Sequence, residues 1–313
     1  ARGRSVSPAR KRKSRLGKLA LLFLILVMVA AGAFGYLAYQ RYQGFADTAI
    51  AGIDKGETLR VAPGDTLPKV LRKLREIGVE TSSFEWRALA KQMGAAGKIQ
   101  IGEYALEPGM TPRDLLARMR DGKVMSYRFT IVEGWNIRDL RAALAKATPL
   151  KQQTAQLDDS ALMRALERGG QHPEGRFLPE TYQYTRDDSD LDVLKRAADA
   201  MDKALVEAWA SRDPQLPLNS AYELLTLASI VEKETGVADE RPQIAGVFVR
   251  RLKMPMRLET DPTVIYGMGS AYSGNIRKTD LRTDTPYNTY TRDGLPPTPI
   301  SMPGRSALQA VAH

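Results

Sequence analysis

The sequence predicts an α+β protein with a single N-terminal transmembrane helix, a small strand–helix–helix–strand module and a larger mixed α/β domain. Three observations lead to this fold class. An uncharged apolar stretch lies near the N-terminus, short strand and helix patterns alternate after it, and longer helical patterns dominate the rest. The predicted divisions are a tail at 1–18, a transmembrane helix at 19–39, a linker at 40–55, a module at 56–126 and a domain at 127–313.

The first 18 residues form a basic tail. They contain eight Lys or Arg residues and no Asp or Glu, in a chain with 46 basic and 36 acidic residues and a formal net charge of +10. Without the tail, 38 basic residues face 36 acidic ones, so the rest of the protein is nearly neutral. A neutral surface does not favour a phosphate backbone. We therefore expect no nucleic acid partner.

Residues 19–39 (LALLFLILVMVAAGAFGYLAY) form the apolar segment. At a rise of about 1.5 Å per residue it is long enough to span a hydrocarbon core of about 30 Å, which predicts a transmembrane helix. A cleaved signal peptide is the alternative, with residues 30–33 as a loose cleavage site, but its apolar region is usually about 7–15 residues long. The basic tail favours a cytoplasmic N-terminus, with the rest of the chain across the membrane. Residues 40–55 are weakly patterned and are expected to form a juxtamembrane linker.

The chain has no cysteine and only two histidines, His172 and His313. The exported part must therefore fold without disulfides. Two distant histidines without cysteines do not make a recognisable zinc site. The sequence also lacks a Gly-rich phosphate loop of the usual spacing and a Gly-x-Ser-x-Gly motif. We expect no metal and no organic cofactor.

Residues 56–126 alternate between strand and helix patterns. The expected elements are strands at 59–61 and 101–106 and helices at 70–77, at 83–93 and after Thr111. Thr66 and Thr111 are placed to cap the first and third helices. In the second helix, Phe84, Leu89 and Met93 are expected to face inward.

This strand–helix–helix–strand order, with Val61–Leu67 (VAPGDTL) at its head, resembles a LysM-like module. Such modules often contact glycans that contain N-acetylglucosamine. A small packing or spacer domain that binds nothing explains the same pattern, because the Gly-Asp-Thr-Leu piece also fits simple helix capping. Both interpretations stay open.

From residue 127 onward the helices become longer. The expected elements are a strand at 127–132 and helices at 137–144, 191–209 and 221–234. The last third reads as loop-rich, because its prolines are expected to prevent long helices. These prolines are Pro262, Pro286, Pro296, Pro297, Pro299 and Pro303.

The helix at 221–234 carries two candidate acids, Glu232 and Glu234. They fall on opposite shoulders of its apolar face, about 160° apart, so they cannot share one site. Each could be half buried beside apolar side chains, and burial raises a carboxyl pKa toward that of a general acid. The alternative is two solvated glutamates near a helix end, paired with Lys233 or Arg241.

Three proline-stiffened loops are rich in Tyr, Asn, Thr and Asp, at 259–267, 284–290 and 294–300. Amides and hydroxyls can bond sugar hydroxyls, and aromatic rings can stack on a pyranose face. Rigid structural loops with tyrosines in the core explain the same composition, and the composition alone favours neither.

Four motifs occur in a characteristic order: Leu227–Thr235 (LASIVEKET), Asp261–Gly267 (DPTVIYG), Tyr287–Tyr290 (YNTY) and Gly294–Pro297 (GLPP). Together they resemble the YceG-like family, the endolytic murein transglycosylases. Residues 174–182 also resemble a segment of that family, although Arg176 and Leu178 depart from its usual residues. Because the family usually continues past the position of His313 with further strands, we expect the C-terminus of the catalytic domain to be incomplete.

The resemblance implies a lytic transglycosylase that cuts the β-1,4 bond between N-acetylmuramic acid and N-acetylglucosamine in peptidoglycan strands, leaves 1,6-anhydro ends and terminates nascent strands. It places the catalytic acid and base on Glu232, with Glu234 as the fallback. The candidates for holding the sugar are Asp261, Thr263, Tyr287, Asn288 and Tyr290. It also implies the bacterial inner membrane, a periplasmic catalytic domain and penicillin-binding peptidoglycan synthases as partners.

Two alternative functions stay open. One is a catalytically silent, membrane-tethered scaffold that binds glycan. The other is a muramidase that uses water, with Glu232 and Asp261 as its carboxylate pair. The products distinguish the three functions, because they are an anhydro end, no product and a reducing end respectively.

Overall fold

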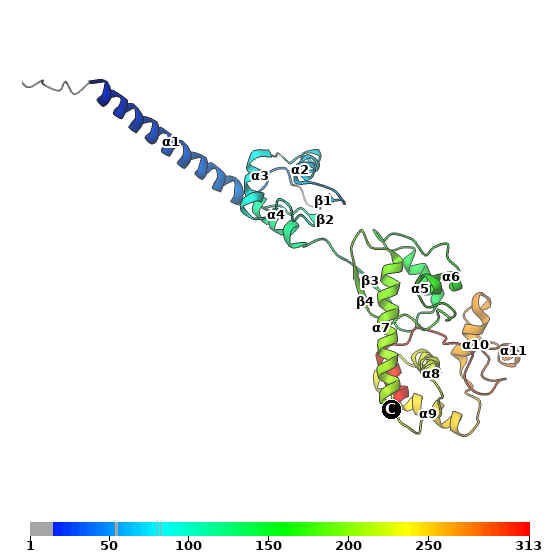
Figure 1. Cartoon of the computed structure of the whole chain (residues 1–313). Helices are drawn as coiled ribbons and strands as arrows, with labels where there is room; N and C mark the ends of the chain where they lie inside the picture. The colour runs from blue at the N-terminus through cyan, green and yellow to red at the C-terminus, as the bar shows by residue number, and fades with distance from the viewer. Residues whose placement is uncertain (1–14, 54–55, 80, 82) are drawn as a thin grey trace, which may run out of the picture. The chain divides into compact units, whose positions relative to one another are not determined.

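The computed structural model describes residues 15–53, 56–79, 81 and 83–313. It divides into two compact units, residues 1–125 and 126–313, each with a hydrophobic core of its own (Figure 1). Helices predominate over a few short strands, which confirms the predicted mixture of helix and sheet. The predicted basic tail lies outside the described residues as far as residue 14.

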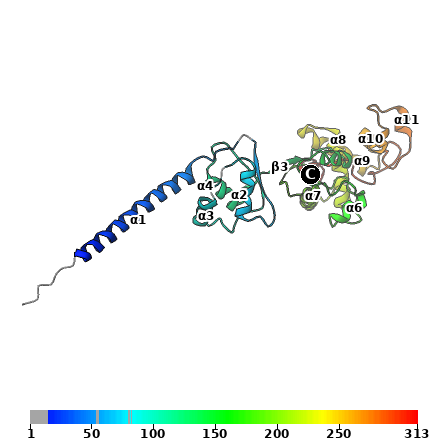
Figure 2. The same ribbon diagram turned by 90° about the horizontal axis from the view of Figure 1, so that it is seen from above.

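Helix α1 runs without a break from Arg15 to Asp47 (Figure 2). In the described part of the chain it is the one helix whose length and composition would allow it to cross a membrane, with a mean hydropathy of 2.5 over an 18-residue window. The juxtamembrane linker at 40–55 stays a prediction, and its first half, as far as Asp47, is helical. The Phe45 ring meets the Trp86 ring edge-on at 5.7 Å, and Ala46 is fully buried. Tertiary packing thus keeps this weakly patterned stretch helical.

The first unit combines a two-stranded sheet with three helices. Strand β1 (Thr58–Val61) pairs antiparallel with β2 (Gly102–Ala105), α2 (Leu67–Glu76) and α3 (Ser83–Gln92) lie between them in sequence, and α4 (Pro112–Asp121) follows. In the sheet, Leu59 stands opposite Tyr104, and both are buried. The predicted strand–helix–helix–strand order is therefore confirmed, and the likeness to a LysM module stays a prediction.

The predicted inward face of α3 is partly wrong. Phe84 is 80% exposed, whereas Trp86, Leu89 and Ala90 are buried. Positions 86, 89, 90 and 93 follow one helical stripe, and Phe84 lies outside it. The larger indole ring at Trp86 determines which face of α3 packs against the core.

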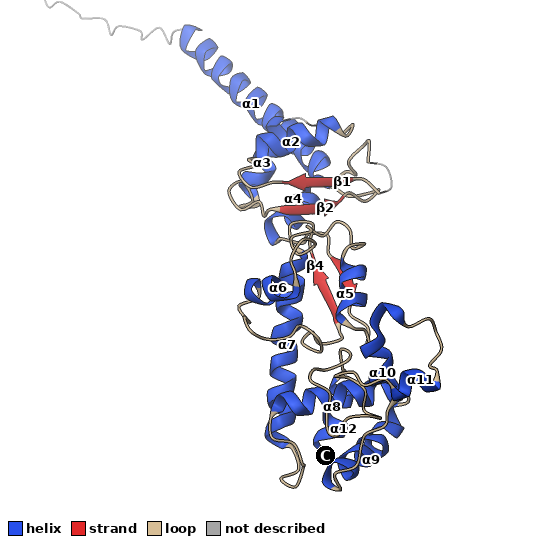
Figure 3. Cartoon of the chain, turned by 90° about the vertical axis from the view of Figure 1, so that its right-hand side faces the viewer, coloured by secondary structure: helices blue, strands red, loops and turns tan. Residues whose placement is uncertain are grey.

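The second unit begins with a two-stranded sheet and the helices around it (Figure 3). Strand β3 (Tyr127–Thr130) pairs antiparallel with β4 (Thr181–Tyr184), and the helices are α5 (Ile137–Leu144), α6 (Asp159–Ala165) and α7 (Asp190–Ser211). Their shared core contains Phe129, Phe177 and Val193. The predicted helix at 137–144 is confirmed at both ends, and the long helix is confirmed with small extensions.

Helix α8 is the centre of the remaining core. The elements of this region are α8 (Ala221–Glu234), η1 (Ala238–Glu240), α9 (Arg241–Lys253), α10 (Asp261–Met268), η2 (Gly269–Ala271), α11 (Lys278–Arg282) and α12 (Arg305–Ala312). Nine consecutive residues of α8, Leu224–Glu232, are buried. A helix buried on every side is a core helix. It contacts α7, α9, α10 and α12, so its C-terminal end is held from several directions.

The last third is more helical than predicted. Pro242 and Pro262 do not break helices, because they stand in the first turns of α9 and α10. The missing N–H of proline has no helical partner to lose at that position, and its fixed φ suits the first turn. The prolines between α11 and α12 do lie in irregular backbone, as predicted.

Candidate active site

The last turn of α8 carries Glu232, the predicted acid and base. Its side chain is 4% exposed. Oxygen Oε2 accepts a hydrogen bond of 2.8 Å from the backbone N–H of Gly304, and Oε1 accepts one of 2.9 Å from the guanidinium of Arg241. The carboxyl group is therefore fixed from two directions, by the residue before α12 and by the first residue of α9.

Arg241 connects Glu232 to a second carboxyl group, that of Glu133. Its Nη2 lies 3.1 Å from Glu133 Oε2, and the Glu133 side chain is 44% exposed. One cation thus stands between two carboxylates. Burial raises the pKa of Glu232, and the charge of Glu133 raises it further, while the Gly304 N–H and Arg241 act in the opposite direction. A raised pKa allows a carboxyl group to carry a proton as a general acid.

The loop before α12 is fastened along α8. The N–H of Ile300 donates to Ser229 Oγ at 3.0 Å, and Ser301 Oγ donates to the Ser229 carbonyl at 3.0 Å. At Gly304 a Cβ atom would lie 2.0 Å from Glu133 Oε1. The absence of a side chain there therefore lets the Gly304 amide and the Glu133 carboxyl both approach Glu232.

The surroundings of Glu232 were mostly invisible to sequence reasoning. Arg241 was considered as an ion-pair partner, but Glu133, Ser229 and Gly304 were not. Glu133 lies 108 residues before its partner Arg241 in the sequence, and Gly304 lies 72 residues after its partner Glu232. No spacing rule connects such distant positions. The turn Glu133-Gly134-Trp135 between a strand and a helix was the one local signal near Glu133.

A pocket of ≈ 410 Å³ adjoins this site. It is lined by residues from the loop before α5 and its first turn, from the end of α8, from α10 and the turns after it, and from the loop before α12: Gly134, Asn136, Arg138, Lys233, Pro262, Ile265, Tyr266, Gly269, Tyr272 and Ile300. Lys233 Nζ donates to the Gly134 carbonyl at 3.3 Å. Because Lys233 follows Glu232 and Gly134 follows Glu133, the wall of the pocket is continuous with the carboxyl site.

Asp261 and Tyr290 form one unit of the predicted sugar-binding set. The Tyr290 hydroxyl donates to Asp261 Oδ1 at 2.7 Å. Burial and the adjacent Asp261 raise the pKa of Tyr290 to about 12. Asp261 is exposed at the start of α10, and Tyr290 is half-buried, so both have surface that a ligand can reach.

Thr263 and Asn288 are buried and bonded to the protein. Thr263 Oγ1 lies 2.7 Å from the Thr260 carbonyl and 2.9 Å from Thr289 Oγ1. Asn288 Nδ2 donates to the Thr283 carbonyl at 2.7 Å, and its Oδ1 accepts from the N–H of Tyr290 at 2.9 Å. These contacts fix the loop that carries Tyr290.

Tyr287 lies between the pocket wall and the proline-rich loop. Its ring meets the Tyr266 ring edge-on at 4.9 Å, and its hydroxyl lies 2.9 Å from Thr298 Oγ1. Tyr287 therefore packs against a tyrosine that lines the pocket.

Glu234, the fallback candidate, is separated from Glu232. It is exposed, which agrees for this residue with the alternative of a solvated glutamate, and it accepts a hydrogen bond from the Thr260 hydroxyl. The predicted separation of the two glutamates on the helix agrees with these different partners. Within the described ranges, no group of three or more His, Cys, Asp or Glu residues has an arrangement that could hold a metal ion.

Glu174 is a fully buried carboxyl that sequence reasoning did not select. Both of its oxygens lie 3.1 Å from the N–H of Ile137, and Tyr266 donates its hydroxyl to Oε2 at 2.9 Å. Burial raises the pKa of Glu174 to about 7, although these hydrogen bonds lower it. Glu174 therefore links the start of α5 to a tyrosine of the pocket wall.

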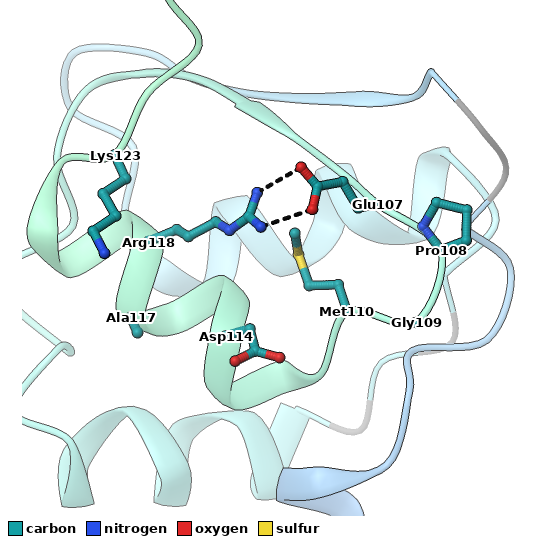
Figure 4. A pocket seen from close by; sticks show the side chains of 8 residues that line it. All are labelled: Glu107, Pro108, Gly109, Met110, Asp114, Ala117, Arg118 and Lys123. Carbon is teal, nitrogen blue, oxygen red and sulfur yellow. Dashed lines mark hydrogen bonds and ion pairs between the residues drawn. The ribbon is translucent and has the colours of Figure 1, made fainter.

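A separate hollow of ≈ 650 Å³ lies in the first unit (Figure 4). Three of its four charged groups have partners: Arg118 donates twice to Glu107, at 3.1 and 2.8 Å, and Asp114 accepts from Thr111. None of the eight residues that line it is aromatic. It therefore offers no ring on which a sugar face could stack, and it gives no support to glycan binding by this unit.

The chain is similar to several known proteins. One is an endolytic murein transglycosylase from Bacillus subtilis strain 168, 31% identical over 272 residues that cover 82% of this chain and 75% of the relative. Another of the same name, from Streptococcus pneumoniae strain D39, is 26% identical over 295 residues, and the chain spans about half (52%) of its length. A YceG-like protein from Listeria monocytogenes, solved at 2.6 Å, superposes with a TM-score of 0.52 at 28% identity, over 82% of this chain and 89% of that one.

The family comparison agrees with these relatives. Residues 59–313 match the YceG-like family, so the match includes α8, the Glu232 site and the adjoining pocket. The motifs that suggested the resemblance all lie within this range. This chain therefore belongs to the YceG-like family.

Proposed function

We propose that this protein is a lytic transglycosylase of peptidoglycan, anchored in the bacterial inner membrane by α1, and that Glu232 is its acid and base. The observation that carries the proposal is the buried Glu232 carboxyl, whose pKa is raised and whose two oxygens are held by Gly304 and Arg241. The names of the relatives from B. subtilis and S. pneumoniae supply the substrate class.

In this proposal the protonated Glu232 gives its proton to the oxygen that leaves with N-acetylglucosamine, and the bond from that oxygen to C1 of the muramoyl sugar breaks. The resulting carboxylate then takes the proton of the muramoyl 6-hydroxyl, whose oxygen forms the new bond to C1. No water is consumed and a 1,6-anhydro end results. One carboxyl group serves both steps, so a second catalytic carboxylate is unnecessary.

Substrate access requires a small rearrangement, because the Glu232 side chain is 4% exposed. The more exposed Glu133 forms the outer side of the ion-paired group, and its displacement would uncover the acid. Asp261, Tyr287 and Tyr290 are proposed to hold the sugar, whereas Thr263 and Asn288 would act by fixing the loops that carry them.

Three variants of the full-length protein in detergent test the mechanism. Glu232→Gln keeps the size of the side chain and removes its titrating proton, so we expect a folded protein whose activity falls by roughly 10²–10⁴-fold. Glu234→Gln is the matched control and should cost far less. Asp261→Asn should mainly weaken binding if Glu232 works alone. The measurement is anhydro-muropeptide release by mass spectrometry, with circular dichroism to verify folding.

Each alternative function predicts a different result. Reducing ends from the wild type, together with an Asp261→Asn loss as large as that of Glu232→Gln, would indicate a muramidase. No product from the wild type, with glycan binding retained, would indicate a scaffold. A folded Glu232→Gln protein that still forms anhydro ends at the wild-type rate would exclude Glu232 as the acid.

A further inference from the structure

We propose that the pocket between α5, α8 and α10 binds a carboxylate attached to the sugar, through Arg138 and Lys233. The proposal rests on the proposed function, since it identifies which part of a peptidoglycan strand the pocket recognises. Such a pocket would distinguish the muramoyl sugar, which carries a lactyl group, from its uncharged glucosaminyl neighbour.

The two sides of the pocket differ in chemistry. One side is apolar and aromatic, with Pro262, Ile265, Tyr266 and Tyr272 from α10 and the turns after it. The volume, ≈ 410 Å³, is within the usual range of small-ligand sites, about 300–1,000 Å³. Aromatic side chains of this kind suit the face of a sugar ring.

The other side carries two cations. Arg138 extends from the first turn of α5 toward α10, since a Cβ atom at Gly269 would lie 3.0 Å from its Nη1. Lys233 comes from the end of α8 and meets Gly134, whose added Cβ would lie 3.9 Å from its Nζ. The cations thus stand on α5 and α8 and both line the same pocket.

Neither cation is neutralised by an ion pair in the described part of the chain. Lys233 donates to a carbonyl, that of Gly134, at 3.3 Å. The carboxyl groups nearby have other hydrogen-bond partners: Glu133 pairs with Arg241, and Asp139 accepts from the N–H of Asn136. Glu174 accepts from Tyr266 and Ile137, and burial raises its pKa to about 7 overall, although the charge of Arg138 lowers that pKa. The residues that line the pocket therefore include two cations and no carboxyl group.

A neutral glycan leaves this charge uncompensated. Sugar hydroxyls and acetamides need mixed donors and acceptors, whereas guanidinium and ammonium groups only donate and bind carboxylates with charge-assisted hydrogen bonds. A muramoyl sugar offers a carboxylate in two forms. On a strand without peptides it is the lactyl carboxylate itself, and on a strand with peptides it is a carboxylate of the peptide.

Binding of defined tetrasaccharides to the full-length protein carrying Glu232→Gln tests the proposal without turnover. Four ligands of alternating muramoyl and glucosaminyl sugars are compared by isothermal titration calorimetry: free lactyl carboxylates, lactyl methylamides, peptides with free carboxylates, and peptides with amidated carboxylates. We expect a carboxylate ligand to bind about tenfold or more tightly than its amide, the scale of one charge-assisted hydrogen bond. The pair that shows the difference identifies the source of the carboxylate.

Arg138→Gln and Lys233→Gln should each remove most of that preference and leave amide binding unchanged. Lys253→Gln, an exposed lysine at the end of α9 outside the pocket, is the matched control and should change neither. Both test residues are exposed, so these variants should fold. Equal binding of carboxylate and amide ligands would overturn the proposal, as would equal losses for both ligands in the two variants.

The result is separable from the proposed function. Wild-type cleavage without any carboxylate preference would refute this inference and leave the transglycosylase intact. Carboxylate-dependent binding without wild-type cleavage would support the pocket and refute the activity.

Discussion

A carboxyl group that first gives and then takes a proton must change charge easily, and the residues around Glu232 meet this requirement. Arg241 alone would hold Glu232 ionised. Glu133 shares the same guanidinium, so two carboxylates compete for one cation. Glu232 therefore binds a proton more readily than it would beside Arg241 alone. The charge of Glu133 thus favours the protonated form of the proposed acid.

Replacing Glu133 by Gln should move the pH profile. The amide can still accept a hydrogen bond from Arg241 but carries no charge, so the pKa of Glu232, which the charge of Glu133 raises, should fall. The alkaline limb of kcat/KM, where the general acid loses its proton, should then shift to lower pH. Glu234→Gln is the control and should leave the limb in place. An unchanged or upward-shifted limb would contradict this role.

Glu174 predicts a pH-dependent stability. Its pKa is raised from 4.5 to about 7 in the folded protein, so the folded state binds the proton more tightly than the unfolded state. Its contribution to stability is fully present below the unfolded pKa and is lost as the pH rises through about 7. Relative to the wild type, Glu174→Gln should gain on the order of 3 kcal/mol in unfolding free energy between pH 4.5 and pH 8.

Urea unfolding in detergent, followed by the fluorescence of Trp135 and Trp209 in the second unit, measures this difference. Glu207→Gln, an exposed carboxyl on α7, serves as the control. A wild-type-minus-variant difference that stays constant with pH would show that Glu174 does not titrate in this range.

At the scale of elements, α8 and the loop laid along it position the acid. Ser229 is buried within α8 and accepts the N–H of Ile300, four residues before Gly304. The helix, the loop and the start of α12 are therefore one assembly around Glu232. Loss of the hydrogen bond between Ser229 and Ile300 should therefore reduce the activity.

Ser229→Ala should destabilise the second unit and reduce activity together. The Ile300 N–H would be left without a partner in the core, which costs about 1–3 kcal/mol. The looser loop would hold the Gly304 amide less firmly against Glu232. Ser160→Ala, on the exposed surface of α6, is the control. Urea unfolding and anhydro-product release should both fall for Ser229→Ala; a stable, fully active variant would contradict the coupling.

The elements show where sequence reasoning succeeds. Helix 221–234 was predicted at both ends from its apolar residues, and the structure shows that Ser220 caps it. The sequence does not predict helices α9, α10 and α12. Proline reads as a helix breaker, but Pro242 and Pro262 stand in the first turns of α9 and α10, and the apolar stripe of α12 covers only about two turns. Glu232 could be selected from its motif, but its partners could not, because they meet it only through the fold.

At the scale of the whole chain, the predicted topology is testable. The eight basic residues before Leu19 predict a cytoplasmic N-terminus, and α1 is the one described helix suited to crossing the membrane. A reporter active only in the periplasm, fused after residue 50 of the full chain, should work. A cytoplasmic reporter at the same position is the control and should be silent. Activity of the cytoplasmic reporter alone would reverse the assigned orientation.

Because α1 is unbroken, it fixes the direction in which the first unit faces around the helix axis. The helix ends in packed contacts, Phe45 against Trp86 and Asp47 with Arg113 at 2.7 Å, so the first unit must turn with it. One residue inserted after Tyr39 would swing the module by about 100° around the helix axis and lift it by about 1.5 Å. An insertion of seven residues would return the module to within about 20° of its original orientation around the axis, roughly 10 Å farther along it. In the proposed membrane-anchored protein, the same stretch of sequence therefore sets both the direction in which the first unit faces and its height above the bilayer, and only insertions of whole turns change the height alone.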